Sequence, residues 1–203
     1  MSATVCLALT GASGLPYGLR LLECLLGAGC RVQLLYSQAA QIVARQELDF
    51  DLPSRPADAK AALLARFPGV DGDRLQVFGR EEWFAPVASG SNPPDAMIVC
   101  PCSMGTLAAI AQGLSDKLIE RAADVVLKEG RKLVLVPRET PFSAIHLENM
   151  LRLSRAGAVI LPPSPGYYHH PQSVQDIVDF VVARVLDQIA VPHTLMQRWG
   201  EDR

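Results

Sequence analysis

Short apolar runs alternate with helical patterns along most of the chain, and this alternation restricts the fold more than any other feature. The apolar runs occupy residues 4–10, 31–36, 75–78, 96–100, 132–137 and 158–161. Helical patterns occupy residues 19–29, 38–46, 57–66, 103–113, 115–130, 141–157 and 174–189. Strands that alternate with helices predict an α/β fold with a doubly wound parallel sheet, Rossmann-like or flavodoxin-like.

Several helices begin with capping signals. Ser37 and Ser115 are each expected to cap the helix that follows. Pro141 is expected to open the helix at 141–157. Ser173 and Asp176 resemble a capping box, in which each residue bonds to the other's backbone at the start of the last helix.

Size and composition favour one globular domain over residues 1–203. The chain is 49% hydrophobic and 20% charged, which excludes a disordered or collagen-like chain. Lys and Arg number 19 and Asp and Glu number 21, so the net charge is −2. No broad basic surface is therefore expected for nucleic acid or an anionic membrane. Any anionic ligand must meet a local cluster of positive groups.

The short apolar runs and the cysteine usage both favour a cytoplasmic protein. The first apolar run, from Val5 to Leu9, is too short for the core of a signal peptide. No run approaches the roughly 20 apolar residues of a spanning helix. The 5 cysteines are odd in number, and Cys100 and Cys102 form a C-x-C pair that fits neither thioredoxin-like nor zinc spacing. We expect buried, reduced thiols.

Small and charged residues follow the predicted strands, where parallel sheets bind their ligands. They are Gly11-Ala12-Ser13-Gly14, Ser37, Cys102-Ser103-Met104-Gly105-Thr106, Arg138-Glu139 and the loop with Tyr168. Hydroxyl residues at helix N-termini, together with one arginine, predict a phosphate site that needs no metal. The neighbouring His169 and His170 point apart in extended chain, so we expect no metal there either.

Each of these features also has a plainer interpretation. The GASG turn is not the G-x-G-x-x-G dinucleotide pattern, and Ser37 and Ser103 are compatible with simple helix caps. Glu47 fits a solvated helix end, and Glu139 fits either a general acid or base or a surface ion pair with its neighbour. Trp83 lies in a loop, where it could stack on a flat ring.

Five blocks that span nearly the whole chain have a familiar appearance: GASGLPYG, SQAA, ASGSNPPDAMIVCPCSMGTLAAIAQG, ERAADVVLKEGRKLVLVPRETPFSAIHLENM and PGYYHHPQSVQDIVDFVVARVLDQ. They closely resemble the UbiX-type flavin prenyltransferases. The resemblance implies a transferase that joins a dimethylallyl group from dimethylallyl monophosphate to reduced FMN, through bonds at flavin N5 and C6. The product, prenylated FMN, serves UbiD-type decarboxylases, including the one in ubiquinone biosynthesis.

The same resemblance implies roles for individual residues. The FMN-binding set is Gly11, Ala12, Ser13, Ser37, Cys102, Ser103, Met104, Gly105 and Arg138. The set for the dimethylallyl phosphate is Tyr168, Arg184, Lys128 and Arg121. Catalytic roles fall to Ser13, Glu47, Glu139 and Trp83. Trp199 matches a second aromatic position near the flavin, and Gly105 stands where some members carry Lys.

The resemblance also implies a homododecamer with active sites between subunits. Arg121 and Lys128 are seven residues apart on one helix face, which is solvated unless another subunit covers it. We expect such residues to reach a neighbour's site, and the helix and tail at about residues 173–203 to make oligomer contacts.

Two other functions compete with the transferase. One is an FMN-dependent decarboxylase of cysteine-type carboxylates, which typically carries P-A-S-A-N-T-like and P-x-M-N-x-x-M-W-like segments. The chain has neither, and CPCSMGT stands in place of the first. The other is a non-catalytic FMN carrier, which needs the FMN loops but not Glu139, Tyr168 or Arg184.

Overall fold

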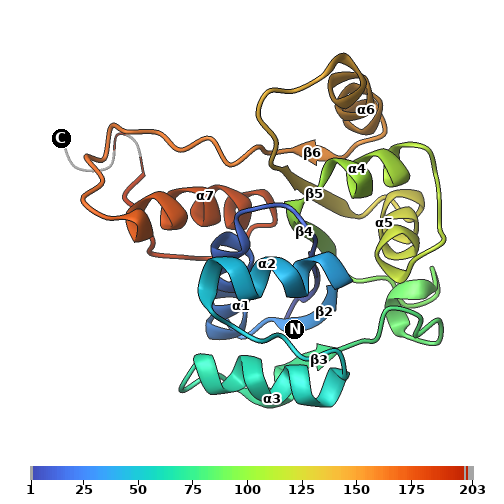
Figure 1. Ribbon diagram of the computed structural model, residues 1–203, viewed down its shortest axis with the longest axis horizontal. Coiled ribbons are helices and arrows are strands. Elements are labelled where there is room, and N and C mark those ends of the chain that lie inside the picture. Colours follow the sequence, from blue (N-terminus) through green and yellow to red (C-terminus); the bar gives the residue numbers. More distant parts are fainter. Residues whose placement is uncertain (1, 199, 201–203) are drawn as a thin grey trace.

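The protein, described here by a computed structural model over residues 2–198 and 200, is built on a parallel sheet. The described strands pair in the order β3-β2-β1-β4-β5-β6, and every neighbouring pair is parallel (Figure 1). Their bounds are β1 Thr4–Leu9, β2 Arg31–Tyr36, β3 Leu75–Val77, β4 Ala96–Cys102, β5 Lys132–Pro137 and β6 Val159–Ile160. The predicted doubly wound α/β fold is confirmed.

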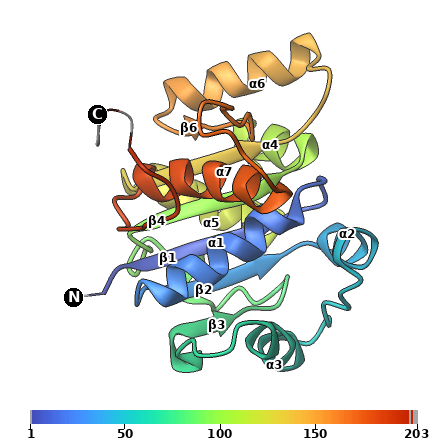
Figure 2. The same cartoon turned by 90° about the vertical axis from the view of Figure 1, so that its left-hand side faces the viewer.

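Helices cover both faces of this sheet, which explains why its strands read as continuous apolar runs. One face packs against α1 (Leu15–Gly27), α2 (Gln38–Leu48), α3 (Pro56–Arg66) and α7 (Val174–Gln188). The other packs against α4 (Met104–Ala111), α5 (Leu118–Lys128) and α6 (Ala144–Arg155). Figure 2 shows α1 and α7 crossing in front of the sheet with α5 behind it. The chain winds outward from β1 in both directions, so the strand order reverses between β1 and β4.

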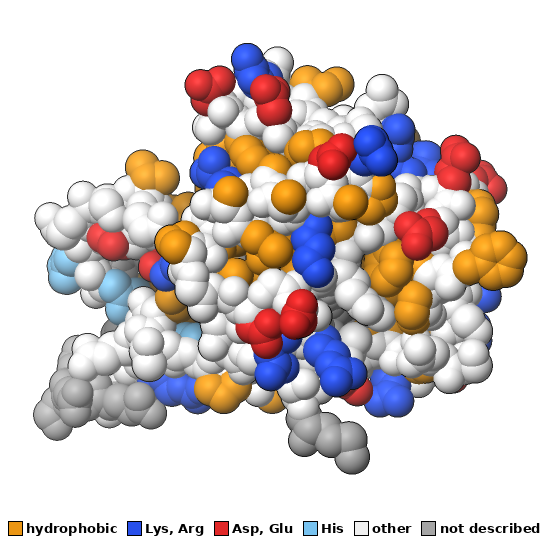
Figure 3. Space-filling view, turned by 90° about the horizontal axis from the view of Figure 1, so that it is seen from below, with side chains coloured by type: hydrophobic (Ala, Val, Ile, Leu, Met, Phe, Trp, Pro, Cys, Tyr) orange, Lys and Arg blue, Asp and Glu red, His pale blue; other side chains and the backbone are white. Residues whose placement is uncertain are grey.

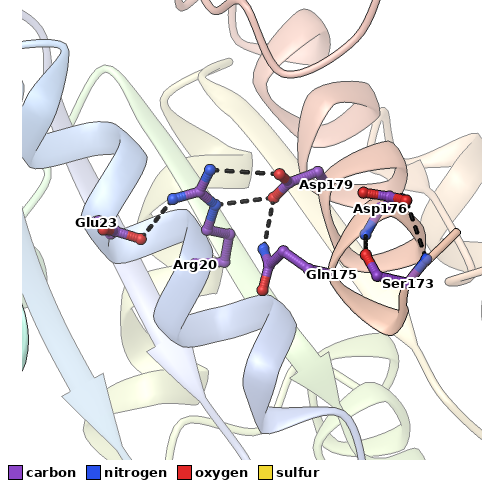
Figure 4. Close-up of polar contacts among 6 residues, drawn as sticks. All are labelled: Arg20, Glu23, Ser173, Gln175, Asp176 and Asp179. Carbon is purple, nitrogen blue, oxygen red and sulfur yellow. Dashed lines mark hydrogen bonds and ion pairs between the residues drawn. The ribbon is translucent and has the colours of Figure 1, made fainter. Parts of the chain in front are cut away.

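Two of the predicted caps are confirmed. The Ser37 side chain accepts a hydrogen bond from the Ala40 backbone at 3.1 Å and caps α2. At the start of α7, Ser173 Oγ accepts from the Asp176 backbone at 3.2 Å, and the Asp176 carboxylate accepts from the Ser173 backbone at 3.0 Å (Figure 4). These hydrogen bonds satisfy N–H groups that have no partner inside the helix.

Two other helix starts were predicted wrongly. Ser115 does not cap α5, which begins at Leu118; the Glu120 carboxylate instead accepts from the Asp116 and Lys117 backbones at 3.1 and 3.2 Å. Pro141 does not open α6 either. That helix begins at Ala144, because Ser143 caps it by accepting from the His146 backbone at 3.3 Å.

The bounds of α1 and β4 also differ from expectation. Helix α1 begins at Leu15 rather than at residue 19, since Pro16 lies in the first turn, where proline fits a helix without losing a hydrogen bond. Strand β4 runs two residues past Cys100 to Cys102 and passes through Pro101, with an irregular register against β5 between Val99 and Cys102.

An arginine joins the first helix to the last. Arg20 on α1 donates from Nε and Nη2 to the two carboxylate oxygens of Asp179 on α7, at 2.8 and 3.3 Å (Figure 4). It also donates to Glu23 at 2.6 Å, and Gln175 donates to Asp179 at 2.8 Å. The hydrogen bonds to Asp179 and Glu23 raise the pKa of Arg20 above its usual value. The two-pronged pair fixes α7 on α1.

The five cysteine thiols lie in the hydrophobic core or pack against it. All five cysteines are free; Cys24 is half-buried and the other four are buried. Burial raises the pKa of the Cys6 and Cys102 thiols to about 12, so both are protonated at neutral pH. Within the described residues, no helix is long and apolar enough to cross a bilayer.

Candidate active site

Hydrogen bonds tie neighbouring strand ends together at the carboxyl edge of the sheet. The Ser37 backbone donates to the Leu9 carbonyl at 3.0 Å, which joins the ends of β2 and β1. The Arg138 backbone donates to the Cys102 carbonyl at 3.3 Å, which joins the ends of β5 and β4. The sequence-predicted residues after four different strands therefore lie along one edge, on both sides of the point where the strand order reverses.

Thr10 closes the remaining gap, between β1 and β4. Its fully buried hydroxyl donates to the Pro101 carbonyl at 2.7 Å and accepts from the Ser103 backbone at 2.8 Å. Sequence reasoning missed this residue. The available signal was a hydroxyl side chain placed directly after the first apolar strand.

The GASG turn packs tightly against the start of α2. A Cβ on Gly11 would lie 2.3 Å from the Cβ of Ala39, so only glycine fits there. Gly14 has a φ of 109°, a left-handed conformation that L-residues rarely adopt. Ala12 is buried while Ser13 is exposed, which leaves the Ser13 hydroxyl as the turn's outward polar group.

Glu47 binds this turn and is not the solvated helix end that the plainer interpretation favoured. Its carboxylate accepts from the Gly14 backbone at 3.1 and 3.0 Å and from the Leu15 backbone at 2.9 Å. Gly14 is the N-cap of α1 and makes no side-chain cap of its own. A carboxylate from the end of α2 therefore caps α1.

The second flavin loop predicted from sequence forms the start of α4. Ser103 is the N-cap: its Oγ accepts from the Thr106 backbone at 3.3 Å and lies 3.0 Å from Thr106 Oγ1. Met104 begins the helix, and Gly105 is exposed with open space around its Cβ position. Cys102 lies fully buried before them, and its carbonyl accepts the Arg138 backbone N–H.

Arg138 and Glu139 follow β5 at the same edge. The Nε atom of Arg138 is buried and has no hydrogen-bond partner among the described residues. Burying a donor of a charged group without a partner is costly, so its presence indicates an anionic or acceptor ligand. Glu139 Oε1 accepts from the Thr140 backbone at 3.1 Å.

A cavity of about 540 Å³ opens beside the Ser37 cap. Its lining includes Ser37, Gln38 and Ile42 from α2, Arg80, and Thr106 from α4. The Arg80 guanidinium donates to Gln38 at 3.2 Å, and sequence reasoning had assigned Arg80 no role.

Two exposed aromatic residues follow the cavity-lining residues Arg80 and Glu81 in the sequence. Trp83 is 44% exposed, and the Phe84 side chain beside it is fully exposed. Trp83 is not among the residues that line the cavity, and its role as a stacking platform stays a prediction.

A second cavity, of about 560 Å³, brings together two of the predicted phosphate ligands. Tyr168 and Arg184 both line it, together with Phe180, Asp187 and His193. Arg184 comes from α7, and Tyr168 from the loop after β6.

Arg121 and Lys128 lie elsewhere in the protomer. They belong to α5, on the opposite face of the sheet from α7 (Figure 1). Arg121 donates to the Ala88 carbonyl at 3.0 Å and to Asp124 at 2.8 Å, and Lys128 pairs with Glu129. One protomer does not bring them to Tyr168. Trp199 lies outside the described residues.

Comparison with known proteins connects this edge to a family. The sequence matches the Flavoprotein family over residues 1–186. It is 57% identical, over 197 residues, to the flavin prenyltransferase UbiX of Pseudomonas aeruginosa, covering 97% of this chain and 94% of that protein. The chain belongs to the UbiX family of flavin prenyltransferases.

Solved structures of UbiX-type proteins share the whole fold. AnUbiX (PadA1), crystallised with FMN and dimethylallyl pyrophosphate, is 40% identical with a TM-score of 0.87, and the match covers 100% of both chains. A dodecameric FMN-dependent UbiX-like decarboxylase from Escherichia coli O157:H7 is 44% identical with a TM-score of 0.85, covering 97% of this chain and 98% of that one. The UbiX assignment thus holds for sequence and fold alike.

Proposed function

We propose that this protein joins the dimethylallyl group of dimethylallyl monophosphate to reduced FMN, through bonds at flavin N5 and C6. One observation carries the proposal beyond family membership. The buried Nε of Arg138, which has no hydrogen-bond partner in the described part of the chain, lies at the sheet edge where Ser37 and Ser103 cap two helix N-termini. An anionic, planar ligand such as FMN fits that donor set, because helix N-termini and guanidinium groups both favour anions.

The FMN-binding residues divide into two kinds. Gly11, Ala12, Ser13, Cys102, Met104 and Gly105 are proposed to contact the flavin through their backbone. Ser37, Ser103 and Arg138 add two hydroxyl groups and a guanidinium. Bound reduced flavin supplies an electron-rich nitrogen, N5, as nucleophile. The protein's task is to hold the ring and exclude water.

The phosphate of the second substrate fits the cavity of Tyr168 and Arg184. A phenol hydroxyl and a guanidinium stabilise the negative charge that grows on the phosphate as the allylic C–O bond breaks. The phosphate leaves with the electron pair of that bond, and the allyl carbon bonds to the flavin. Trp83 stabilises the positive allyl group by cation–π attraction.

Forming the C6 bond releases a ring proton, and Glu139 is the proposed acceptor. Its carboxylate lies at the same edge as Arg138 and is only half-buried. Glu47 shares the proposed proton handling with Glu139, and Ser13 helps to stabilise the departing phosphate. Glu47 additionally holds the Gly14 and Leu15 backbone, so its structural contribution has to be measured separately.

A homododecamer would bring Arg121 and Lys128 from α5 to a neighbour's substrate. The relative from Escherichia coli is described as dodecameric, and several apolar side chains here are exposed: Phe84, Ile145, Leu147, Leu151 and Val174. The inner face of α7 is already buried against α1, so this helix has only its outward side for the oligomer contacts proposed for residues 173–203.

Prenylated FMN made here would pass to a UbiD-type decarboxylase, and we place the reaction in the cytoplasm. Five free cysteines suit a reducing compartment. Lys and Arg are interspersed with Asp and Glu on the face seen in Figure 3, and the net charge is −2. That surface does not favour nucleic acid as a partner.

Phosphate release tests the proposal. Anaerobic incubation with reduced FMN and dimethylallyl monophosphate should release one phosphate per flavin consumed, and the diphosphate serves as a second arm. Release of CO2 from a cysteine-type carboxylate would favour the decarboxylase instead. FMN binding without phosphate release would favour the carrier.

A further inference from the structure

Three donors surround one carboxylate in the cavity of Tyr168 and Arg184. Asp187 Oδ2 accepts from Arg184 Nη1 at 2.7 Å. Its Oδ1 lies 3.2 Å from His193 Nε2 and 3.6 Å from Arg198 Nη2. The Asp187 side chain is 25% exposed, so water competes only partly for these contacts.

His193 fixes the carboxylate from the protein side. Its side chain is 7% exposed, and its Nδ1 is buried without a hydrogen-bond partner among the described residues. An ionised carboxylate can only accept, so the Nε2–H of His193 is the donor. Asp187 is therefore anchored at Oδ1 by a buried ring and presents Oδ2 to Arg184.

Arg184 is held by Asp187 and still has hydrogen-bond donors available for a ligand. Its guanidinium donates one N–H to Asp187, and its side chain is 51% exposed at the cavity. The described part of the chain gives its other nitrogens no hydrogen-bond partner. A guanidinium held at one nitrogen keeps a fixed plane while its other donors face a ligand.

We propose that Asp187 is a positioning residue that orients Arg184 toward the phosphate of the allylic substrate, with His193 holding Asp187 in place. This rests on the proposed function for the identity of the substrate. Because Arg184 is oriented before the substrate arrives, less side-chain entropy is lost on binding. The phosphate is therefore bound more tightly.

Loss of the Asp187 negative charge and loss of its positioning role have opposite predicted effects on phosphate binding, so an Asp187 variant distinguishes the two. Replacing Asp187 by Asn removes a negative charge beside Arg184 and Arg198, and a purely electrostatic cavity would then bind phosphate more tightly. Arg184 is half-exposed, so solvent screens that effect. The positioning account therefore predicts weaker binding in Asp187→Asn.

The experiment compares Asp187→Asn with Glu23→Gln in the full-length oligomer. Glu23 also pairs with an arginine three residues earlier on a helix, at 2.6 Å, but contacts neither cavity residue. We expect Asp187→Asn to raise KM for dimethylallyl monophosphate about tenfold. KM for reduced FMN should stay within twofold, and Glu23→Gln should leave both unchanged. Equal or lower KM for the phosphate, or equal increases for both substrates, would overturn the inference.

Two further measurements separate this inference from the proposed function. Calorimetry with oxidised FMN bound measures binding of dimethylallyl monophosphate without turnover. A wild type that binds but never transfers would overturn the proposed function only, whereas Asp187→Asn binding as tightly as wild type would overturn the inference only. His193→Phe should weaken binding severalfold, and His193→Gln, which keeps a donor, should restore most of it. Equal binding by both variants would remove His193 from the account.

Discussion

The backbone N–H of Gly14, at the start of α1, donates to both carboxylate oxygens of Glu47, near the end of α2. The N–O distances are 3.1 Å to Oε1 and 3.0 Å to Oε2. A negative charge at a helix N-terminus is stabilising, because the unpaired N–H groups there carry partial positive charge. The contact also fixes the turn that follows β1. A residue proposed for proton transfer thus also holds the turn that is proposed to bind flavin.

Glu47→Gln should separate these two contributions. The amide keeps one acceptor oxygen but loses the charge, so we expect the free energy of unfolding to fall by about 1 kcal/mol. FMN binding should also weaken, since the turn is less firmly held. Urea unfolding and fluorescence titration with FMN measure both effects. Glu148→Gln, at an exposed position of α6, is the matched control and should change neither quantity. Unchanged stability in Glu47→Gln would contradict the capping role.

Thr10→Val should damage the site without touching any exposed residue. The substitution keeps the shape but leaves the Ser103 backbone N–H without its buried acceptor. The Pro101 carbonyl loses the hydroxyl donor and keeps only the Thr10 backbone N–H, at 3.2 Å. An unsatisfied buried group costs about 1–3 kcal/mol, and we expect denaturant unfolding to show a loss of that size. Thr10→Ser retains the hydroxyl and should keep most of the stability; a Val variant as stable as wild type would refute the bridging role.

Alkaline pH should destabilise the protein through its buried thiols. Burial raises the pKa of Cys6 from 9.0 to about 12 in the folded state, so above pH 9 the unfolded state loses this proton first. Fewer protons bound in the unfolded state means that stability falls as pH rises between 9 and about 12. One such thiol contributes about 1.4 kcal/mol per pH unit in that window.

Comparing wild type with Cys6→Ala isolates this contribution from the other groups that titrate there. Urea unfolding at several pH values above 9 should show a shallower loss of stability in the variant. Identical slopes in the two proteins would mean that Cys6 ionises equally well when folded.

Local patterns predicted the strands well because β1, β2, β4 and β5 are buried on both faces. The run 31–36 coincides with β2 and the run 132–137 with β5. Failures occurred where a neighbouring side chain decided the helix start. Glu120 displaced Ser115 as the capping group of α5, and Ser143 displaced Pro141 at α6.

The candidate site was predictable where a residue's place after a strand was enough. Ser37, Ser103 and Arg138 lie at the expected edge for that reason. The Thr10 bridge and the Glu47 cap were not predictable, since they join residues 91 and 33 positions apart. Such contacts exist only once the sheet is assembled.

Glu139→Gln tests the proposed proton acceptor. Glutamine cannot take up the C6 proton, so formation of the C6 bond, which closes a fourth ring on the flavin, should stall while FMN binding stays at the wild-type level. Fluorescence titration measures the binding. Mass spectrometry with absorbance measures the yield of the flavin that carries both the N5 and the C6 bond. Wild-type yields of that product would remove Glu139 from this step.

The mass of the flavin after reaction tests the central claim most directly. The full-length protein is incubated without oxygen with reduced FMN and dimethylallyl monophosphate, and the flavin is then extracted for mass spectrometry. We predict a gain of one prenyl unit, absent when FMN stays oxidised. Flavin recovered at its original mass, from protein that binds both ligands, would contradict the prenyltransferase assignment.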